Sequence, residues 1–135
     1  MKKAVFIVLL VCGNAGASEW VHAGKRAGAD FYIDPVSVKE VGKYRSASIM
    51  TDLQSPKQVF GGRQATYYLS TRRVLHFDCA KKTAAVTESS FHAESMGEGE
   101  MVERYSTNLR SASFSKPHPD TLDDKVLEVV CSTPL

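Results

Sequence analysis

The sequence has no apolar run long enough to cross a membrane. Its longest run, Ala4 to Val11, has about eight residues and would rise only ~12 Å as a helix, against a hydrocarbon core of ~30 Å. No later segment is longer, so we expect no transmembrane segment once the start of the chain has been removed.

A strong excess of charge of one sign is also absent, with 17 Lys and Arg against 15 Asp and Glu. Two of the 17 basic residues, Lys2 and Lys3, lie at the very start, so the chain from Ser18 onward has 15 of each sign. A protein that binds nucleic acid without regard to sequence needs a basic face to displace counterions. We therefore expect no nucleic-acid partner.

The start of the chain has the three parts of a cleavable signal peptide. Lys2 and Lys3 form the basic part, the apolar run follows, and Ala15-Gly16-Ala17 supplies the small residues at a cleavage site. We predict that residues 1–17 are a signal peptide and that residues 18–135 form a single domain, exported to the periplasm or the cell surface.

The alternative processing route attaches a lipid at Cys12, because Leu9 lies at the right distance before it. Lipoprotein processing prefers Gly, Ala or Ser immediately before the cysteine, and the branched Val11 is there instead. Cleavage after Ala17 is the prediction that we retain.

Cysteine is scarce, and beyond the leader only Cys79 and Cys131 remain. The alternatives to a disulfide are a metal site or a redox couple, which require a second nearby pair or a Cys-x-x-Cys spacing. The oxidising compartment instead favours a structural disulfide. It would close a loop of about 53 residues and stabilise the domain by up to ~4 kcal/mol in the chain-entropy model.

Apolar residues recur mainly with period two, which is typical of strands with one buried face. The clearest examples are the segments 29–34, 47–53 and 73–79. Trp20 opens a short first strand. A tight hairpin about Lys81-Lys82 is predicted to lead into a strand that ends near Phe91.

Proline and glycine predict the interruptions between these strands. Asp34-Pro35, followed by Gly42, indicates a strand end and one helical turn. Pro56 and Gly61-Gly62 predict a loop or a widened hairpin end between Gln54 and Ala65. The segment from Glu94 to Glu103 predicts a turn and a final strand, and Ser106 to Pro119 is predicted to be irregular.

The last segment changes to a helical period. Thr121 and Asp124 resemble a capping box with Asp in place of Glu, and Cys131 lies at the end of the predicted helix. One face of this helix carries Leu122, Val126, Leu127, Val129 and Val130. The fold class predicted is α+β, a single antiparallel sheet of five or six strands with a C-terminal α-helix packed on one face and tied by the disulfide.

Two His and carboxylate pairs have a spacing that can hold a metal ion, His76-x-Asp78 and His92-x-Glu94. The predicted hairpin puts His76 opposite Thr87 and leaves His92 ~17 Å away, so the pairs do not converge. Cys79 and His76, three residues apart in a strand, face opposite sides and cannot act together as nucleophile and base. We therefore expect no catalytic site, metal or cofactor.

Three other clusters also favour ordinary surface. Gly97-x-Gly99 lacks the third glycine and the helix of a phosphate-binding loop. An acidic trio could suggest calcium but lacks the aspartate-rich loop of such sites, Glu98, Glu100 and Glu103. Arg72-Arg73 and Tyr67-Tyr68 could contact an acidic partner, although alternation predicts that they occupy the solvated face of a sheet.

Several landmarks together resemble the surface-adhesin protein E family, which consists of small exported proteins of Gram-negative bacteria. The similarity extends from Glu19 to Cys131. The residues that carry it are Glu19-Trp20-Val21, Phe31-Tyr32-Ile33-Asp34-Pro35-Val36-Ser37-Val38, Asp52, His76-Phe77-Asp78-Cys79, Met96-Gly97-Glu98-Gly99 and Cys131.

This resemblance implies a six-stranded antiparallel sheet whose C-terminal helix is held by a Cys79–Cys131 disulfide. It also implies exposure at the cell surface and binding of host extracellular-matrix or serum proteins, such as vitronectin and laminin. The alternative function is a periplasmic inhibitor of a host enzyme such as lysozyme, but the sequence has no Ser-Gly-x-x-Tyr inhibitor loop.

Overall fold

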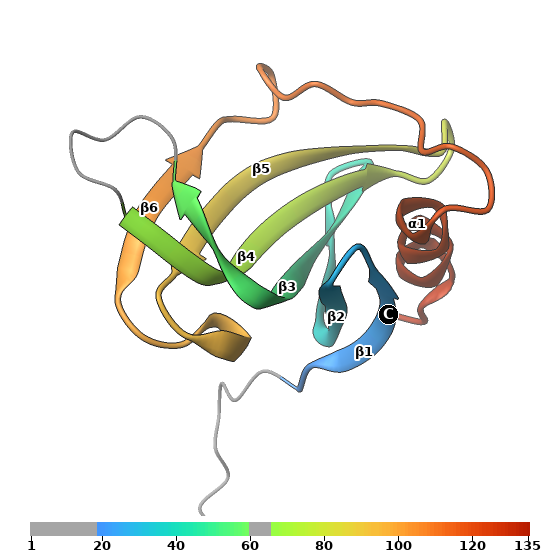
Figure 1. Ribbon diagram of the computed structural model, residues 1–135. Coiled ribbons are helices and arrows are strands. Elements are labelled where there is room, and N and C mark those ends of the chain that lie inside the picture. The colour runs from blue at the N-terminus through green and yellow to red at the C-terminus, as the bar shows by residue number, and fades with distance from the viewer. Residues whose placement is uncertain (1–18, 60–65) are drawn as a thin grey trace, which may run out of the picture.

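The computed structural model describes residues 19–59 and 66–135, so the expected leader and its cleavage site before Ser18 lie outside the described residues. Six strands form one antiparallel sheet in chain order, and a helix lies at one end of it (Figure 1), as predicted. No helix in the described ranges is long and apolar enough to span a membrane. The elements are β1 (Val21–Arg26), β2 (Ala29–Val41), β3 (Tyr44–Val59), β4 (Thr66–Asp78), β5 (Thr83–His92), the 3-10 turn η1 (Ser95–Gly97), β6 (Met101–Ser106) and α1 (Leu122–Ser132).

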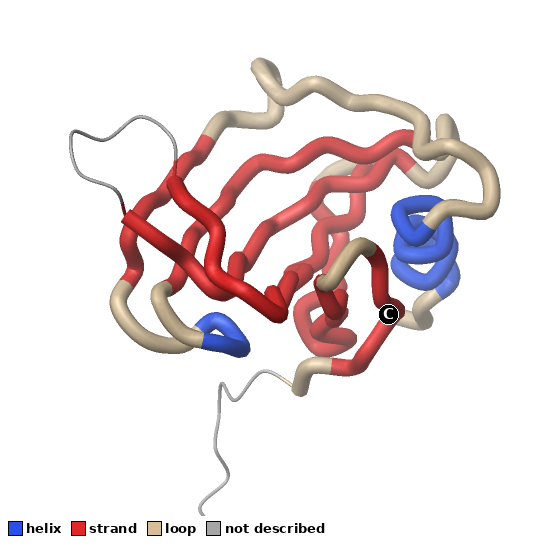
Figure 2. Tube along the Cα trace, viewed as in Figure 1, coloured by secondary structure: helices blue, strands red, loops and turns tan. Residues whose placement is uncertain are grey.

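The hydrophobic core lies between α1 and one face of the sheet. Strand alternation brings Ile33, Ala47, Ile49 and Phe77 to this face, and the helix supplies Val126, Leu127 and Val130. Phe77 and Val130 are almost completely buried, and burial of such a side chain contributes roughly 1.5–3 kcal/mol. The helix packs against β1 to β4 at one end of this face (Figure 2), and no other helix within residues 19–59 and 66–135 covers the rest.

The start of α1 forms half of the predicted capping box. The Thr121 hydroxyl accepts a hydrogen bond from the backbone N–H of Asp124 at 3.3 Å. The Asp124 carboxylate accepts from the N–H of Asp120, at 3.2 Å, rather than from that of Thr121. The predicted apolar face was too wide, because Val129 is 42% exposed.

Two long-range links hold the end of α1 on the sheet. The Cys79–Cys131 disulfide joins the end of β4 to the last turn of the helix, with 5.6 Å between the Cα atoms. From the other side, Arg45 Nη1 donates to the backbone carbonyls of Val130 and Thr133, at 2.9 and 2.7 Å. One of the last carbonyls of the helix, that of Val130, and the carbonyl of Thr133 directly after it are thereby satisfied.

The helical turn predicted after Asp34-Pro35 was wrong, because β2 continues as a strand to Val41. The pairing of β2 with β3 breaks between Asp34 and Lys39, where Pro35 has no N–H to donate. Hydrogen bonds to side chains take the place of the missing backbone hydrogen bonds. The Asp34 carboxylate accepts a hydrogen bond from the Val36 N–H at 3.1 Å, and the Ser37 hydroxyl accepts one from the Ser48 N–H at 2.8 Å.

Of the two alternatives predicted between Gln54 and Ala65, the loop was wrong in its first part, because β3 extends to Val59 and forms one side of a hairpin with β4. Its pairing with β4 breaks between Asp52 and Lys57, which accommodates Pro56, and resumes at Lys57 opposite Tyr68. The remaining part of the predicted loop, residues 60–65, lies outside the described residues.

The segment between β6 and α1 is irregular, as predicted, and runs beside β5 to the start of the helix (Figure 1). It contacts β5 through backbone hydrogen bonds: Ser115 and Ala84 exchange two of 3.0 Å, and the Thr107 N–H donates to the Thr87 carbonyl at 2.9 Å. Phe114 stacks on Tyr44 with 5.0 Å between the ring centroids.

Candidate functional site

The uncovered part of the apolar sheet face forms a groove of about 470 Å³, which follows β4 and is called here the β4 groove. Lys57 and Tyr68 line one end, and Phe77 and Val126 line the other, beneath α1. The groove exists because several strands contribute to the apolar face, whereas a helix of 11 residues covers only one end of it. Its floor includes Phe31, Ile49, Leu53, Leu75 and Val86.

The charges around the β4 groove are mainly positive. Arg26, Lys57 and Arg73 belong to its lining, and Asp123 is the one carboxylate that the described part of the chain contributes to it. Asp123 lies 3.7 Å from Arg26, whose guanidinium is also 5.5 Å from the ring centroid of Phe31. Among the described residues, Lys57 and Arg73 have no carboxylate within 4.0 Å. Two cations therefore line an apolar groove without a counter-charge.

The prediction that Arg72-Arg73 and Tyr67-Tyr68 all occupy the solvated face was wrong for one member of each pair. Arg73 and Tyr68 line the β4 groove. Arg72 lies on the opposite face, with its guanidinium 5.8 Å from the ring centroid of Trp20, and Tyr67 is 55% exposed. Neighbouring residues of a strand point to opposite faces, so these four side chains cannot form one surface.

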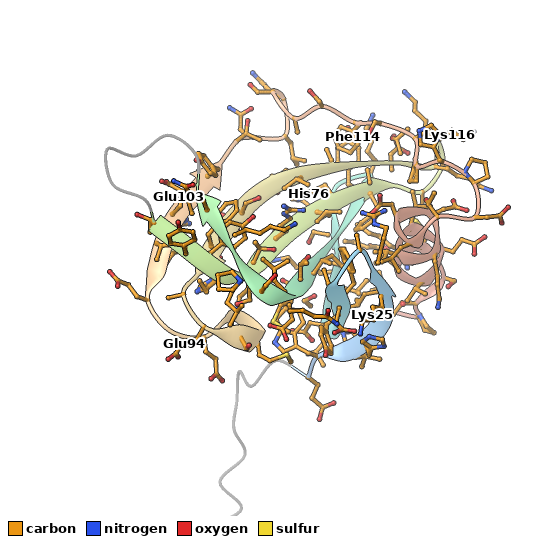
Figure 3. The ribbon with its side chains drawn as sticks, in the orientation of Figure 1. Lys25, His76, Glu94, Glu103, Phe114 and Lys116 are labelled. Atoms are coloured by element: carbon orange, nitrogen blue, oxygen red, sulfur yellow. A yellow bond between two sulfur atoms is a disulfide. The ribbon has the colours of Figure 1, made fainter. Side chains whose placement is uncertain are left out.

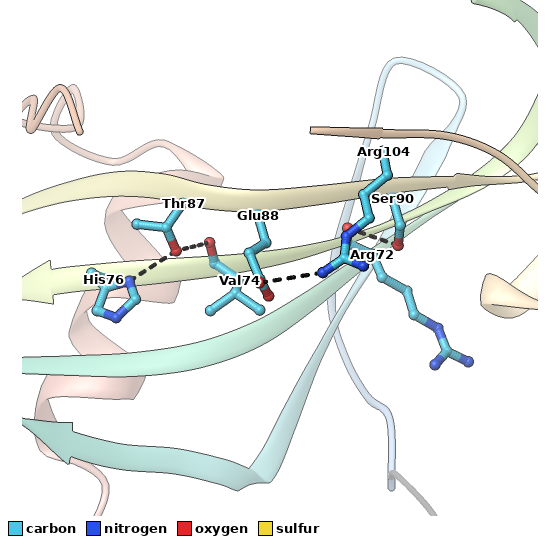
Figure 4. A network of polar contacts seen from close by, with 7 residues as sticks. All are labelled: Arg72, Val74, His76, Thr87, Glu88, Ser90 and Arg104. Carbon is cyan, nitrogen blue, oxygen red and sulfur yellow. Dashed lines mark hydrogen bonds and ion pairs between the residues drawn. The ribbon is translucent and has the colours of Figure 1, made fainter. Parts of the chain in front are cut away.

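His76 lies between Leu75 and Phe77, which line the β4 groove, so alternation puts it on the opposite face of β4. Figure 4 shows His76 beside Thr87. His76 pairs with Ala85, not with Thr87 as predicted, because the turn after β4 takes up the four residues 79–82. A register shift farther along still lets His76 Nδ1 lie 3.0 Å from the hydroxyl of Thr87. Burial lowers the pKa of His76, and the positive charge of Lys39 lowers it further, against the opposing effect of Glu88.

His92 has a separate set of neighbours. Its Nε2 lies 2.8 Å from the Ser90 hydroxyl, and burial, followed by the charge of Arg72, lowers its pKa. A hydrogen bond with the backbone of Gly99 acts in the opposite direction.

The carboxylates predicted to accompany the two histidines have other surroundings. Asp78 accepts a hydrogen bond from Lys81 N–H at 3.1 Å and thereby shapes the turn after β4. Glu94, which was predicted to accompany His92, lies in a different part of the molecule from His76 (Figure 3), so the two predicted pairs do not converge. Within residues 19–59 and 66–135, no three side chains of His, Cys, Asp or Glu gather as a metal site would require.

Gly97-x-Gly99 belongs to a tight turn around η1 that docks onto the sheet. Met96 and Gly97 have positive φ angles of 57° and 71°. The N–H of Met96 donates to the Asp52 carboxylate at 2.9 Å, and that of Gly97 donates to the Ser70 hydroxyl at 2.8 Å. These N–H groups already have partners. These roles of Asp52 and Ser70 were not predicted, because the two residues lie on β3 and β4, far along the sequence from the turn that they bind.

One of the two edge strands of the sheet, β6, carries exposed side chains beside a row of aromatic rings. Met101 and Tyr105 are 51% and 52% exposed. The rings of Tyr68 and Phe91, and of Phe91 and Tyr105, meet edge to face with centroids 4.8 and 5.8 Å apart. In the described part of the chain, β6 pairs only with β5, so its outer edge is open.

The fold and these surfaces can be compared with known proteins. A family model described as surface-adhesin protein E matches residues 20–132. The chain belongs to this family. The description of the family is that of a surface adhesin, which indicates a surface protein that binds other proteins.

Solved structures of one member of the family have the same fold. The crystal structure of protein E from non-typeable Haemophilus influenzae aligns with a TM-score of 0.60 at 18% identity, covering 84% of this chain and 75% of that one. Crystal form II of H. influenzae protein E aligns with a TM-score of 0.58 at 17% identity, covering 87% and 97%. No curated protein sequence matches this chain.

Proposed function

We propose that this protein is an exported adhesin that binds a host extracellular-matrix or serum protein and catalyses no reaction. The observation that carries the proposal is the family match over residues 20–132, which takes in nearly all the described residues. The near-equal numbers of acidic and basic residues fit a protein partner better than a polyanion.

The proposed contact is the β6 edge, defined as Met101–Ser106. An open edge strand has free backbone N–H and C=O groups with which an extended segment of a partner can pair. Tyrosine, methionine and arginine are enriched in protein interfaces, and the edge offers Tyr105, Met101 and Arg104. Tyr105 also rests on Phe91, which limits the conformational freedom lost on binding.

The test combines location with binding. Antibody labelling of intact cells should detect the protein at the surface, and the purified protein should bind immobilised vitronectin or laminin. Tyr105→Ala should weaken binding by about tenfold or more, the effect of losing an aromatic anchor. Tyr67→Ala is the matched control, since this tyrosine is similarly exposed but lies on β4.

Circular dichroism should show that both variants remain folded. Equal binding by the two variants would remove the β6 edge from the proposal. Absence from the cell surface, with inhibition of lysozyme by the purified protein, would favour the periplasmic inhibitor instead.

A further inference from the structure

We propose that the β4 groove binds an amphipathic anion, namely a molecule with one carboxylate and a single alkyl chain, as in a fatty acid. This site is separate from the β6 edge, and it does not depend on the proposed adhesion. Three features of the groove carry the proposal: its apolar floor, its unpaired cations and one buried hydroxyl.

The apolar floor suits an alkyl chain. The groove volume of about 470 Å³ lies within the range of ~300–1,000 Å³ typical of small-molecule sites. Its lining along β4 runs from Tyr68 to Phe77, a strand length of ~30 Å at ~3.3 Å per residue, so the groove is elongated. The end beneath α1 is lined by Phe77, Ala84 and Val126, and no charged side chain of β4 beyond Arg73 belongs to the lining as the described residues form it.

The cations suit a carboxylate. Arg73 is half-buried in the apolar face, and neither Arg73 nor Lys57 has a carboxylate within 4.0 Å among the described residues. A purely apolar ligand would further desolvate Arg73 without supplying a counter-charge, which is costly. A ligand carboxylate would supply both the charge and acceptors that match the guanidinium.

A buried hydroxyl near Arg73 also favours a bound carboxylate. Thr71 lines the groove two residues before Arg73, on the same face of β4, and is 3% exposed. Its Oγ1 has no hydrogen-bond partner among the described residues. Buried hydroxyls are rarely left unsatisfied, and because this oxygen has less than 1 Å² of exposed surface, it donates to a carboxylate bound at Arg73 only after a rotation of the Thr71 side chain. The proposal therefore puts the carboxylate near Thr71 and Arg73 and the chain toward Phe77.

Sodium laurate is the probe, titrated calorimetrically into protein purified from expression of the full chain, with dodecanol as its uncharged analogue. We expect one laurate per protein and clearly weaker binding of dodecanol. Arg73→Gln and Lys57→Gln should each weaken laurate binding by about tenfold, the effect of losing one charge-assisted contact. Lys39→Gln, on the opposite face of the sheet, should leave binding within about twofold.

A further variant tests the part of the groove that is proposed to hold the alkyl chain. Val86→Glu adds a negative charge to the floor at a residue that is 43% exposed, so the fold should tolerate it, and laurate binding should be lost. The proposal is overturned if no laurate binds below about 100 µM, which is ~−5.5 kcal/mol. It is equally overturned if dodecanol binds as tightly as laurate, or if Arg73→Gln and Lys39→Gln bind alike.

Discussion

The Asp52 carboxylate accepts a hydrogen bond of 2.9 Å from the backbone N–H of Met96, a residue 44 positions later in the chain. Met96 has a φ of 57°, in the left-handed region that residues with side chains rarely adopt. The carboxylate thus holds a strained turn against β3. Asp52 and the Met96-Gly97-Glu98-Gly99 segment, two separate landmarks of the family resemblance, are parts of one structural contact.

Asp52→Ala should lower the free energy of unfolding by ~1–3 kcal/mol, because it leaves the Met96 N–H without its charged acceptor. Urea unfolding at pH 7 measures this loss. Asp30→Ala is the matched control: Asp30 is directly opposite Asp52 in the sheet, so either change removes the same cross-strand repulsion. Within the described ranges, the Asp30 side chain has the exposed His22 as its polar partner. Equal losses in the two variants would contradict the role given to Asp52.

Gly97→Ala should destabilise the protein more than Gly42→Ala. Both glycines have a positive φ, 71° and 59°, so each substitution costs about 1 kcal/mol in backbone strain. A Cβ at Gly97 would also collide with the Arg72 side chain, whereas nothing lies within 4 Å of a Cβ at Gly42. Thermal unfolding of the two variants measures the difference.

The predicted collision between a Cβ at Gly97 and the Arg72 side chain can be tested separately. In an Arg72→Ala background, the extra cost of Gly97→Ala should disappear, and the two glycine substitutions should become equal. A persistent difference would show that the crowding at Gly97 has another source.

The sheet, the helix and the disulfide could be predicted because each depends on a local pattern. Alternation placed Cys79 on the same face as Leu75 and Phe77, and helical periodicity placed Cys131 beside Val130. These residues do meet in the core. Burial of the two apolar faces alone brings the two sulfur atoms together, so no knowledge of the three-dimensional structure was needed.

The breaks in strand pairing could not be predicted, because side chains near each break form hydrogen bonds with the unpaired backbone groups and the strand continues. Pro35 is a local signal for a strand end, yet the strand continues, since Asp34 and Ser37 satisfy the backbone groups that the ladder leaves free. His76 shows the same limit. Its register depends on the four-residue turn after β4 and on a later irregularity, neither of which has a clear sequence signal.

The β4 groove was not predictable either. Its existence depends on how much of the sheet α1 covers, which is a property of packing rather than of any segment. Alternation alone does place Arg73 on the face of Leu75 and Phe77, opposite that of Arg72. A cation on an otherwise apolar face was therefore the one signal in the sequence that could have located the groove.

Acidification should destabilise the protein through His76 and His92. Burial lowers the pKa of both below the ordinary value of 6.5, so at low pH the unfolded chain binds more protons than the folded one. Their contribution to stability is thus intact above pH 6.5 and is lost as the pH falls through the folded-state pKa values. His76→Gln and His92→Gln should reduce the loss between pH 7.5 and 5, measured by urea unfolding. An unchanged pH profile in the double variant would refute this origin.

Arg45→Gln should lower the free energy of unfolding by ~1–3 kcal/mol, because the guanidinium satisfies two carbonyls at the end of α1 and complements the negative end of its dipole. Hydrogen exchange should accelerate in the last turn of the helix and remain unchanged in β5. Lys43→Gln is the control, since Lys43 contacts the ring of Tyr44 rather than the helix. A similar effect of both changes would contradict the capping role.

Replacement of both Cys79 and Cys131 by serine should lower the free energy of unfolding by up to ~4 kcal/mol, the loop entropy for a bond that spans 52 positions. The sheet should persist, because its strands pair in chain order and need no crosslink for their register. The helix would then be held by Val126, Leu127, Val130 and the Arg45 hydrogen bonds. We expect limited proteolysis to cut first near α1 while the strand signal in circular dichroism is retained. Wild-type protein treated with a reductant should match the double variant. If reduction leaves the unfolding curve unchanged, the bond contributes nothing to stability, and the packing of α1 alone holds it on the sheet.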